Sequence, residues 1–135
     1  MKIYIASSLE NKEKAAQLIH RIRLSGHTIT YDWTQRGDVR NDGELAMMET
    51  AQSEVNAVTA ADMVIIMLPG GRGTHTELGV ALATRERKKI WVWADNDAPF
   101  GPGTDTCVFY HHPDVTCLSC SLDELCKRVN EVMLY

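Results

Sequence analysis

The sequence lacks a long hydrophobic run and an excess of basic residues, and each absence excludes a class of protein. The longest uninterrupted aliphatic stretch, Met63–Leu68, is far shorter than the roughly 20 residues that a membrane-spanning helix needs. The chain has 14 lysines and arginines against 18 aspartates and glutamates, a net charge of −4. Proteins that bind nucleic-acid polymers usually carry a basic excess. We therefore expect neither a membrane protein nor a partner of polymeric DNA or RNA.

Cysteines are few and come late in the chain, at positions 107, 117, 120 and 126. Near the amino terminus only Ile3–Ala6 is apolar before polar residues begin, so no signal peptide is predicted. Reduced cysteines in a cytoplasmic protein are the resulting expectation. Cys117 and Cys120, with His111 and His112 nearby, have the residue types of a zinc site, but the two pairs lie closer together than in zinc-finger modules. We expect no metal and no cofactor.

The composition is that of an ordinary globular protein. Hydrophobic residues make up 44% and charged residues 24% of the 135 residues, which excludes disordered and fibrous classes. No internal repeat or low-complexity segment divides the chain. We predict a single domain over residues 1–135, long enough to bury a core without disulfides.

Short apolar runs alternate with stretches of helical periodicity. The runs predict strands at Lys2–Ala6, Thr28–Tyr31 and Met63–Leu68 and one within Lys89–Ala94, with weaker candidates at Cys107–Phe109 and Val115–Leu118. The periodicity predicts helices over 11–25, 44–60 and 75–87, and a last helix with apolar residues from Leu122 to Met133 after a capping box of Ser121 and Glu124. On the helix 44–60, one face is expected to carry Leu45, Met48, Val55 and Val58.

This order of elements predicts an α/β fold, an open parallel sheet of about five strands with helices on both faces. In such folds ligands bind beyond the carboxyl ends of the strands. That rule selects three segments as candidate ligand contacts, namely Ala6–Glu10, Asp32–Asp42 and Pro69–Glu77.

The third of these segments is rich in glycine. Gly70, Gly71 and Gly73 join the most apolar strand to a helix, where backbone N–H groups and the helix N-terminus can meet an anion. The pattern matches neither a Walker loop nor the dinucleotide-binding fingerprint. A plain strand–helix turn is the alternative interpretation.

Glu77 follows the glycines, in the predicted first turn of the helix. A glutamate there often does no more than complement the helix dipole. The alternative is a carboxylate aimed into the crevice as a nucleophile or base.

Three segments, KIYIAS, GHTITYDW and AADMVIIMLPGGRGTHTELGVALA, together resemble the nucleoside 2-deoxyribosyltransferase family. That family includes transferases that act on nucleosides and glycosidases that act on nucleoside 5′-monophosphates. The likeness extends from Met1 to about Trp93, and its strongest element is the apolar strand, glycine-rich turn and Glu-Leu-Gly in fixed order. It implies a flavodoxin-like sheet, cleavage of an N-glycosidic bond, and a homodimer or larger assembly.

The resemblance also implies roles for three side chains. Glu77 corresponds to the nucleophile that attacks the anomeric carbon, Tyr4 to the residue that orients it, and Glu54 to the acid that helps to protonate the leaving base. Cleavage passes through an oxocarbenium-like state, so one carboxylate captures the sugar cation while an acid assists the base. We expect Glu77 to stay ionised at a helix N-terminus, and burial to raise the pKa of Glu54.

Substrate contacts are expected along the three segments at the carboxyl edge. The candidates are Ala6, Ser7, Ser8, Asp32, Trp33, Gly71, Arg72, Gly73, Thr74 and His75. Gly71 stands where the nucleoside transferases of the family have an aspartate, which favours the pattern of the monophosphate glycosidases. Glu10 stands where those glycosidases have an arginine, and it would repel a phosphate unless Arg72 compensates.

The sequence leaves several functions open. A base as acceptor makes the protein a transferase, and water makes it a hydrolase. A non-catalytic nucleotide-binding or sensing domain on the same fold is the rival from another class, although such a domain needs no nucleophile. A hydrolase of a nicotinamide dinucleotide or cyclic ADP-ribose-type ligand uses similar bond chemistry. The expected partner in each case is a small nucleoside or nucleotide.

Overall fold

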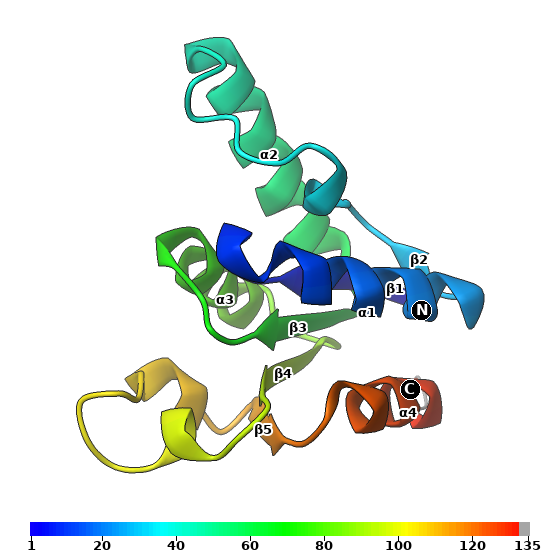
Figure 1. Cartoon of the computed structure of the whole chain (residues 1–135), viewed down its shortest axis with the longest axis vertical. Coiled ribbons are helices and arrows are strands. Elements are labelled where there is room, and N and C mark those ends of the chain that lie inside the picture. Colours follow the sequence, from blue (N-terminus) through cyan, green and yellow to red (C-terminus); the bar gives the residue numbers. More distant parts are fainter. Residues whose placement is uncertain (133–135) are drawn as a thin grey trace.

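A single parallel sheet organises residues 1–132, the part of the chain that the computed structural model describes (Figure 1). Its strands are β1 (Lys2–Ala6), β2 (Thr28–Ile29), β3 (Met63–Met67), β4 (Lys89–Ala94) and β5 (Val115–Ser119), side by side in the order β2-β1-β3-β4-β5. The predicted open parallel sheet is confirmed. Strand β3 is central and buried along its whole length, which explains its unbroken run of apolar residues.

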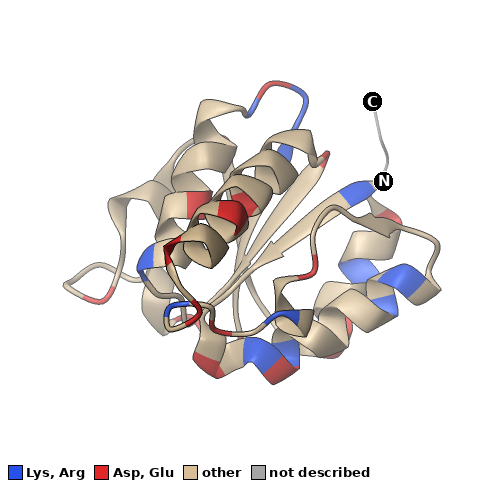
Figure 2. Ribbon diagram, turned by 90° about the horizontal axis from the view of Figure 1, so that it is seen from above, with Lys and Arg blue, Asp and Glu red and all other residues tan. Residues whose placement is uncertain are grey.

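The helices form two layers, one on each face of the sheet. Helix α1 (Lys12–Leu24) packs against α4 (Leu122–Glu131), and α2 (Glu44–Ala60) packs against α3 (Arg72–Ala83). Figure 2 shows the two layers from above. The predicted cap of α4 is present, since Ser121 Oγ accepts a hydrogen bond from the Glu124 N–H at 3.1 Å. Met133, predicted on the last helix, lies outside the described residues.

Helix α3 begins and ends earlier than predicted. It begins at Arg72 because Gly71 acts as the N-cap, with its N–H donating to Thr74 Oγ1 at 3.1 Å. It cannot reach Arg87, whose φ of 61° is left-handed. Glu77 therefore lies in the second turn of α3 and not in the first.

Strand β2 is shorter than predicted. The Trp33 indole N–H donates to the Ile5 carbonyl at 2.7 Å, so it occupies an acceptor on β1 that a longer β2 would have paired with. The chain therefore leaves the sheet after Ile29 and crosses above the end of β1. The strand predicted at Cys107–Phe109 is wrong, because Val108–His111 forms a 3-10 helix instead.

Helix α2 has the predicted bounds but not the predicted buried face. Leu45, Met48 and Val55 are 66%, 53% and 45% exposed, and Val58 is the one of the four predicted residues that is buried. The reason is geometric, because the amino-terminal part of α2 projects beyond the edge of the sheet and has no neighbouring layer to pack against (Figure 1). Within residues 1–132 no helix is both long and apolar enough to cross a membrane.

Candidate active site

Tyr4 and Glu77, 73 residues apart in sequence, are joined by a hydrogen bond inside the protein. Tyr4 lies on β1, next to β3, and Glu77 lies on the helix that follows β3. The Tyr4 hydroxyl donates to Glu77 Oε2. A fully buried tyrosine needs a partner for its hydroxyl, and here the partner is a carboxyl group that is itself only 9% exposed.

Glu77 has an unusual acidity. Burial raises its pKa, the charge of nearby Glu54 raises it further, and the hydrogen bond from Tyr4 opposes both, which leaves a pKa of about 8. The expectation that Glu77 stays ionised is therefore wrong at neutral pH. The favourable field of a helix N-terminus fades within the first turn, and Glu77 lies beyond it.

Glu54, on α2, is a second carboxyl group whose pKa is raised, and the cause is burial, as expected. Its charge acts on both Tyr4 and Glu77, so the three side chains form one electrostatic group. Burial and the neighbouring carboxylates raise the pKa of Tyr4 far above its usual value, so its hydroxyl keeps its proton and remains a donor. The arrangement provides two carboxyl groups in different environments, Glu54 and Glu77, and a hydrogen-bond donor in a fixed position, Tyr4.

A pocket of about 700 Å³ lies over this group at the carboxyl ends of β1 and β3. Its walls are the loop after β1, the segment after β2, the inner side of α2 and the start of α3. The lining residues are Ser7, Ser8, Leu9, Glu10, Tyr31, Trp33, Arg36, Gly37, Asp38, Val39, Arg40, Thr50, Glu54, Pro69, Gly70, Gly71, Arg72, Gly73, Thr74 and Glu77. Both carboxyl groups therefore face a space of the size that a nucleoside or nucleotide needs.

Most of the predicted site residues meet at this pocket. The lining includes Ser7, Ser8 and Trp33, the run from Gly71 to Thr74, and both glutamates. Tyr4 lies behind Glu77. Ser7 is held in place because its hydroxyl donates to the Met67 carbonyl at 2.8 Å.

Ala6, Asp32 and His75 do not belong to the lining. Ala6 is fully buried in β1. Asp32 caps the turn after β2 by accepting from the Thr34 N–H at 3.0 Å, and it pairs with Arg23 at 3.1 Å. His75 uses both ring nitrogens on protein partners.

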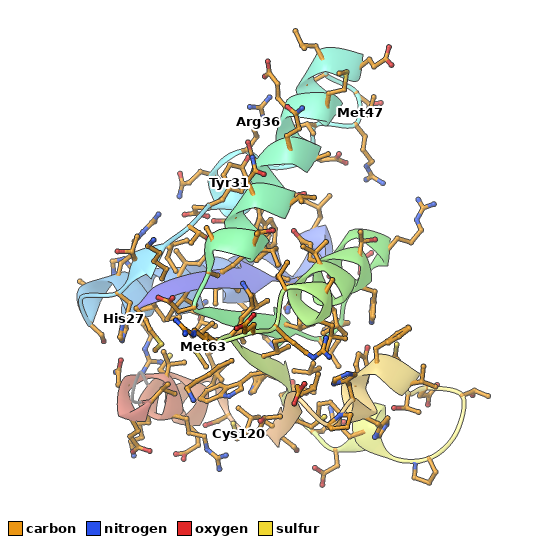
Figure 3. All side chains as sticks on the ribbon, turned by 180° about the vertical axis from the view of Figure 1, so that it is seen from behind. His27, Tyr31, Arg36, Met47, Met63 and Cys120 are labelled. Carbon is orange, nitrogen blue, oxygen red and sulfur yellow. The ribbon has the colours of Figure 1, made fainter. Side chains whose placement is uncertain are left out.

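The segment 30–43, which contains the predicted contact segment Asp32–Asp42, supplies pocket residues that the sequence did not single out, among them Tyr31, Arg36 and Val39. Because β2 ends at Ile29, this segment is free to fold beside α2, where Figure 3 shows Tyr31 and Arg36. Asp38 and Arg40 brace it through an ion pair at 2.6 Å, and the Arg40 guanidinium lowers the pKa of Asp38 to about 2. The only signal in the sequence was the position of this polar stretch after a strand.

A larger hollow, of about 910 Å³, lies at the opposite end of the sheet, around Lys88, Lys89 and Asp114. Two properties favour the smaller pocket as the site. It lies at the carboxyl ends of the strands, where parallel sheets bind ligands, and it contains the two carboxyl groups with raised pKa values.

Cys117, Cys120, His111 and His112 have the residue types of a zinc site, but the structure does not gather them as one. Within residues 1–132 no three His, Cys, Asp or Glu side chains gather as metal ligands would. The cysteines are free, with Cys117 exposed and Cys126 buried.

Fold and pocket together define an α/β protein with a small-molecule site at the carboxyl edge of a five-stranded parallel sheet. The chain belongs to the nucleoside 2-deoxyribosyltransferase family, whose model matches residues 3–130. This membership supports an enzyme of glycosyl transfer or cleavage on small nucleosides. Among the curated proteins, no match was found.

Solved structures with the same fold include an enzyme of each type. The CMP N-glycosidase BcmB of Clostridium botulinum is 16% identical, with a TM-score of 0.65 over 96% of this chain and 99% of its own. A 2-deoxyribosyltransferase from Bacillus psychrosaccharolyticus is 18% identical, with a TM-score of 0.65 over 100% and 99%. A conserved protein from Enterococcus faecalis V583 is 17% identical, with a TM-score of 0.66 over 97% and 98%. At these identities the likeness establishes the fold.

Proposed function

We propose that this chain cleaves or transfers the N-glycosidic bond of a nucleoside or nucleoside 5′-monophosphate, with Glu77 as the nucleophile. The observation that carries the proposal is a buried carboxyl group that faces a pocket, is held by Tyr4 and lies near a second carboxyl group, Glu54. Burial of such a group costs stability, which a domain that only binds nucleotides would have no reason to bear. Family membership supports the type of bond.

The first half-reaction uses the two glutamates in different protonation states. Ionised Glu77 attacks the anomeric carbon and forms a C–O bond while the C–N bond breaks. The electron pair of that bond goes to the departing base, which takes a proton from the Glu54 carboxyl group. The products are a free base and a glycosyl ester on Glu77.

The second half-reaction restores both groups. Water or a second base attacks the anomeric carbon and gives its proton to the Glu54 carboxylate, and the ester bond breaks to regenerate the Glu77 carboxylate. Attack by water gives hydrolysis, and attack by a base gives transfer. The raised pKa of Glu54 suits a proton donor, because burial keeps its carboxyl group protonated at a higher pH than that of an exposed glutamate.

The test is release of free base from nucleosides and their 5′-monophosphates, with and without an added second base. Activity on any of these substrates that yields free base and sugar supports the hydrolase, and a new nucleoside in the presence of the second base supports the transferase. Binding of nucleotides with no turnover of any substrate would favour the binding domain instead.

Tyr4 provides a prediction about pH. Its hydrogen bond lowers the pKa of Glu77, so Tyr4→Phe is expected to raise that pKa further. The apparent pKa near 8 in the profile of kcat/KM against pH, which belongs to Glu77, should then move to higher pH. The maximal rate is expected to fall roughly 10- to 100-fold, the value of one hydrogen bond to a charged group. A shift of this apparent pKa to lower pH in the variant would contradict the assignment.

We also propose that the chain acts as a homodimer or larger assembly. The support, besides the family resemblance, is the exposed apolar side chains of Leu45, Met48 and Val55 on the projecting helix α2. A Met48→Lys variant is expected to lower the molar mass measured by light scattering toward that of one chain. A monomeric mass for the unmodified protein at micromolar concentration would count against an assembly.

A further inference from the structure

His75 uses both nitrogens of its ring to join two distant parts of the chain. Its Nδ1 lies 2.7 Å from the Gly71 carbonyl oxygen, and its Nε2 lies 2.6 Å from the Tyr110 hydroxyl. A carbonyl can only accept, so Nδ1 carries a proton and, in the neutral ring, Nε2 accepts from Tyr110. The imidazole thus ties the turn before α3 to the 3-10 helix Val108–His111.

The turn at Gly70 and Gly71 is packed directly on this histidine. A Cβ atom at Gly70 would lie 2.7 Å from Thr74 Cγ2 and 3.2 Å from His75 Cε1, so the backbone approaches both side chains as closely as glycine allows. Gly71 donates its N–H to Thr74 Oγ1 at 3.1 Å. Close packing does not require glycine at position 71 or 73, because a Cβ atom at either position would meet no atom within 4 Å.

Tyr110 is a firm anchor for this connection. It is 5% exposed and packs edge-on against the Phe100 ring, with ring centroids 6.0 Å apart. The Cys117 thiol donates to its carbonyl oxygen at 3.2 Å. Burial raises the pKa of Tyr110 to about 12, so its hydroxyl keeps the proton that it donates.

From this geometry we infer that His75 and Tyr110 are positioning residues that fix the glycine turn, and that the turn in this position holds the sugar or phosphate end of the substrate. Neither side chain lines the pocket, whereas Gly70, Gly71 and Thr74 do. The inference rests on the proposed function for the identity of the ligand. The way in which His75 and Tyr110 hold the turn does not depend on that function. Glu77 has its own support in Tyr4, so loss of the connection acts on substrate binding more than on the chemical step.

Two substitutions remove the same hydrogen bond from opposite sides. His75→Asn keeps a donor at the place of Nδ1 and loses the partner of Tyr110, and Tyr110→Phe removes the hydroxyl. Each is expected to raise KM roughly tenfold and to change kcat less than threefold, and the double variant should be no worse than the more impaired single one, because both act through one contact. His75→Gln, whose amide can reach Tyr110, is expected to recover part of the loss in KM.

Arg85→Gln is the matched control. Arg85 lies just after the carboxyl end of α3, away from the pocket, and it contacts a later segment through Asp114 at 2.8 Å. It is expected to leave KM unchanged and to change thermal stability little, because the Arg85–Asp114 ion pair is about half exposed. An equal rise in KM in Arg85→Gln, strictly additive effects in the double variant, or a fall in kcat with unchanged KM would each overturn the inference.

A second measurement separates this inference from the proposed function. Hydrogen exchange at the Gly71 and His75 amides, which are bonded to Thr74 Oγ1 and the Gly71 carbonyl, reports the turn without any substrate. Faster exchange in Tyr110→Phe, but not in Arg85→Gln, supports the positioning role even if the unmodified protein releases no base and the proposed function fails. Unchanged exchange in both variants shows that Tyr110 does not hold the turn, whatever the activity.

Discussion

Replacing Glu77 with glutamine is expected to lower the rate of base release on the order of 10³-fold or more while substrate still binds. Glutamine keeps the size of the side chain and can still accept the hydrogen bond from Tyr4, but its amide cannot form the glycosyl ester. The measurement is single-turnover base release together with the dissociation constant of the substrate. In this variant the rate should fall while the dissociation constant stays close to that of the unmodified protein.

A trapped covalent intermediate would identify Glu77 as the nucleophile directly. A substrate with fluorine at C2 of the sugar slows breakdown of the ester, so mass spectrometry should find the sugar attached to the peptide that contains Glu77. Near-normal base release by Glu77→Gln would remove Glu77 from catalysis. Loss of activity without any ester, and with inverted stereochemistry in the freed sugar, would make Glu77 a base that activates water.

Replacing Glu54 with glutamine is expected to have the second largest effect, and its size should depend on the leaving base. For an ordinary nucleobase the rate should fall roughly 10²- to 10⁴-fold, the usual contribution of a general acid. For an activated base that leaves without a proton the loss should be small. The measurement is kcat/KM for a series of bases of different acidity, compared between the variant and the unmodified protein.

The same variant has a diagnostic pH dependence. The charge of Glu54 raises the pKa of Glu77, so its removal should move the apparent pKa of Glu77 in the profile of kcat/KM to lower pH. Tyr4→Phe is expected to move that apparent pKa in the opposite direction. Equal losses for all bases, with no change in the apparent pKa, would reduce Glu54 to a structural role.

The sequence predicted the sheet well because the signals for it are local. Short apolar runs marked the strand Lys2–Ala6 to the residue and the core of the strand Lys89–Ala94, and the glutamate of the motif lies at the pocket as the resemblance implied. The boundaries of the helices were harder to predict from the sequence. The three glycines before Glu77 suggested a long turn, whereas Gly71 is the N-cap of α3, with its N–H bonded to Thr74 Oγ1, and Gly73 lies in the first turn of the helix.

Other features depend on contacts between distant residues and could not be predicted. The periodicity of α2 predicted a buried face, but no local pattern reports that the helix extends past the sheet and leaves Leu45 and Met48 exposed. The early end of β2 depends on the indole of Trp33 and a carbonyl on β1. The pKa of Glu77 depends on how deeply the folded chain buries it.

The burial of Glu77 has a consequence for folding. Its pKa is about 8 in the folded chain against an ordinary value of 4.5, so the folded state binds this proton more tightly than the unfolded state. The stabilisation is fully present below pH 4.5 and is lost as pH rises through about 8. The melting temperature should therefore fall more between pH 5 and pH 9 in the unmodified protein than in Glu77→Gln, by several degrees or more. An equal fall in both would mean that this proton does not couple to folding. The protonation state that can attack the sugar is thus the one in which the native fold is least stable, and natural selection for reactivity and for thermal robustness acts in opposite directions on one carboxyl group.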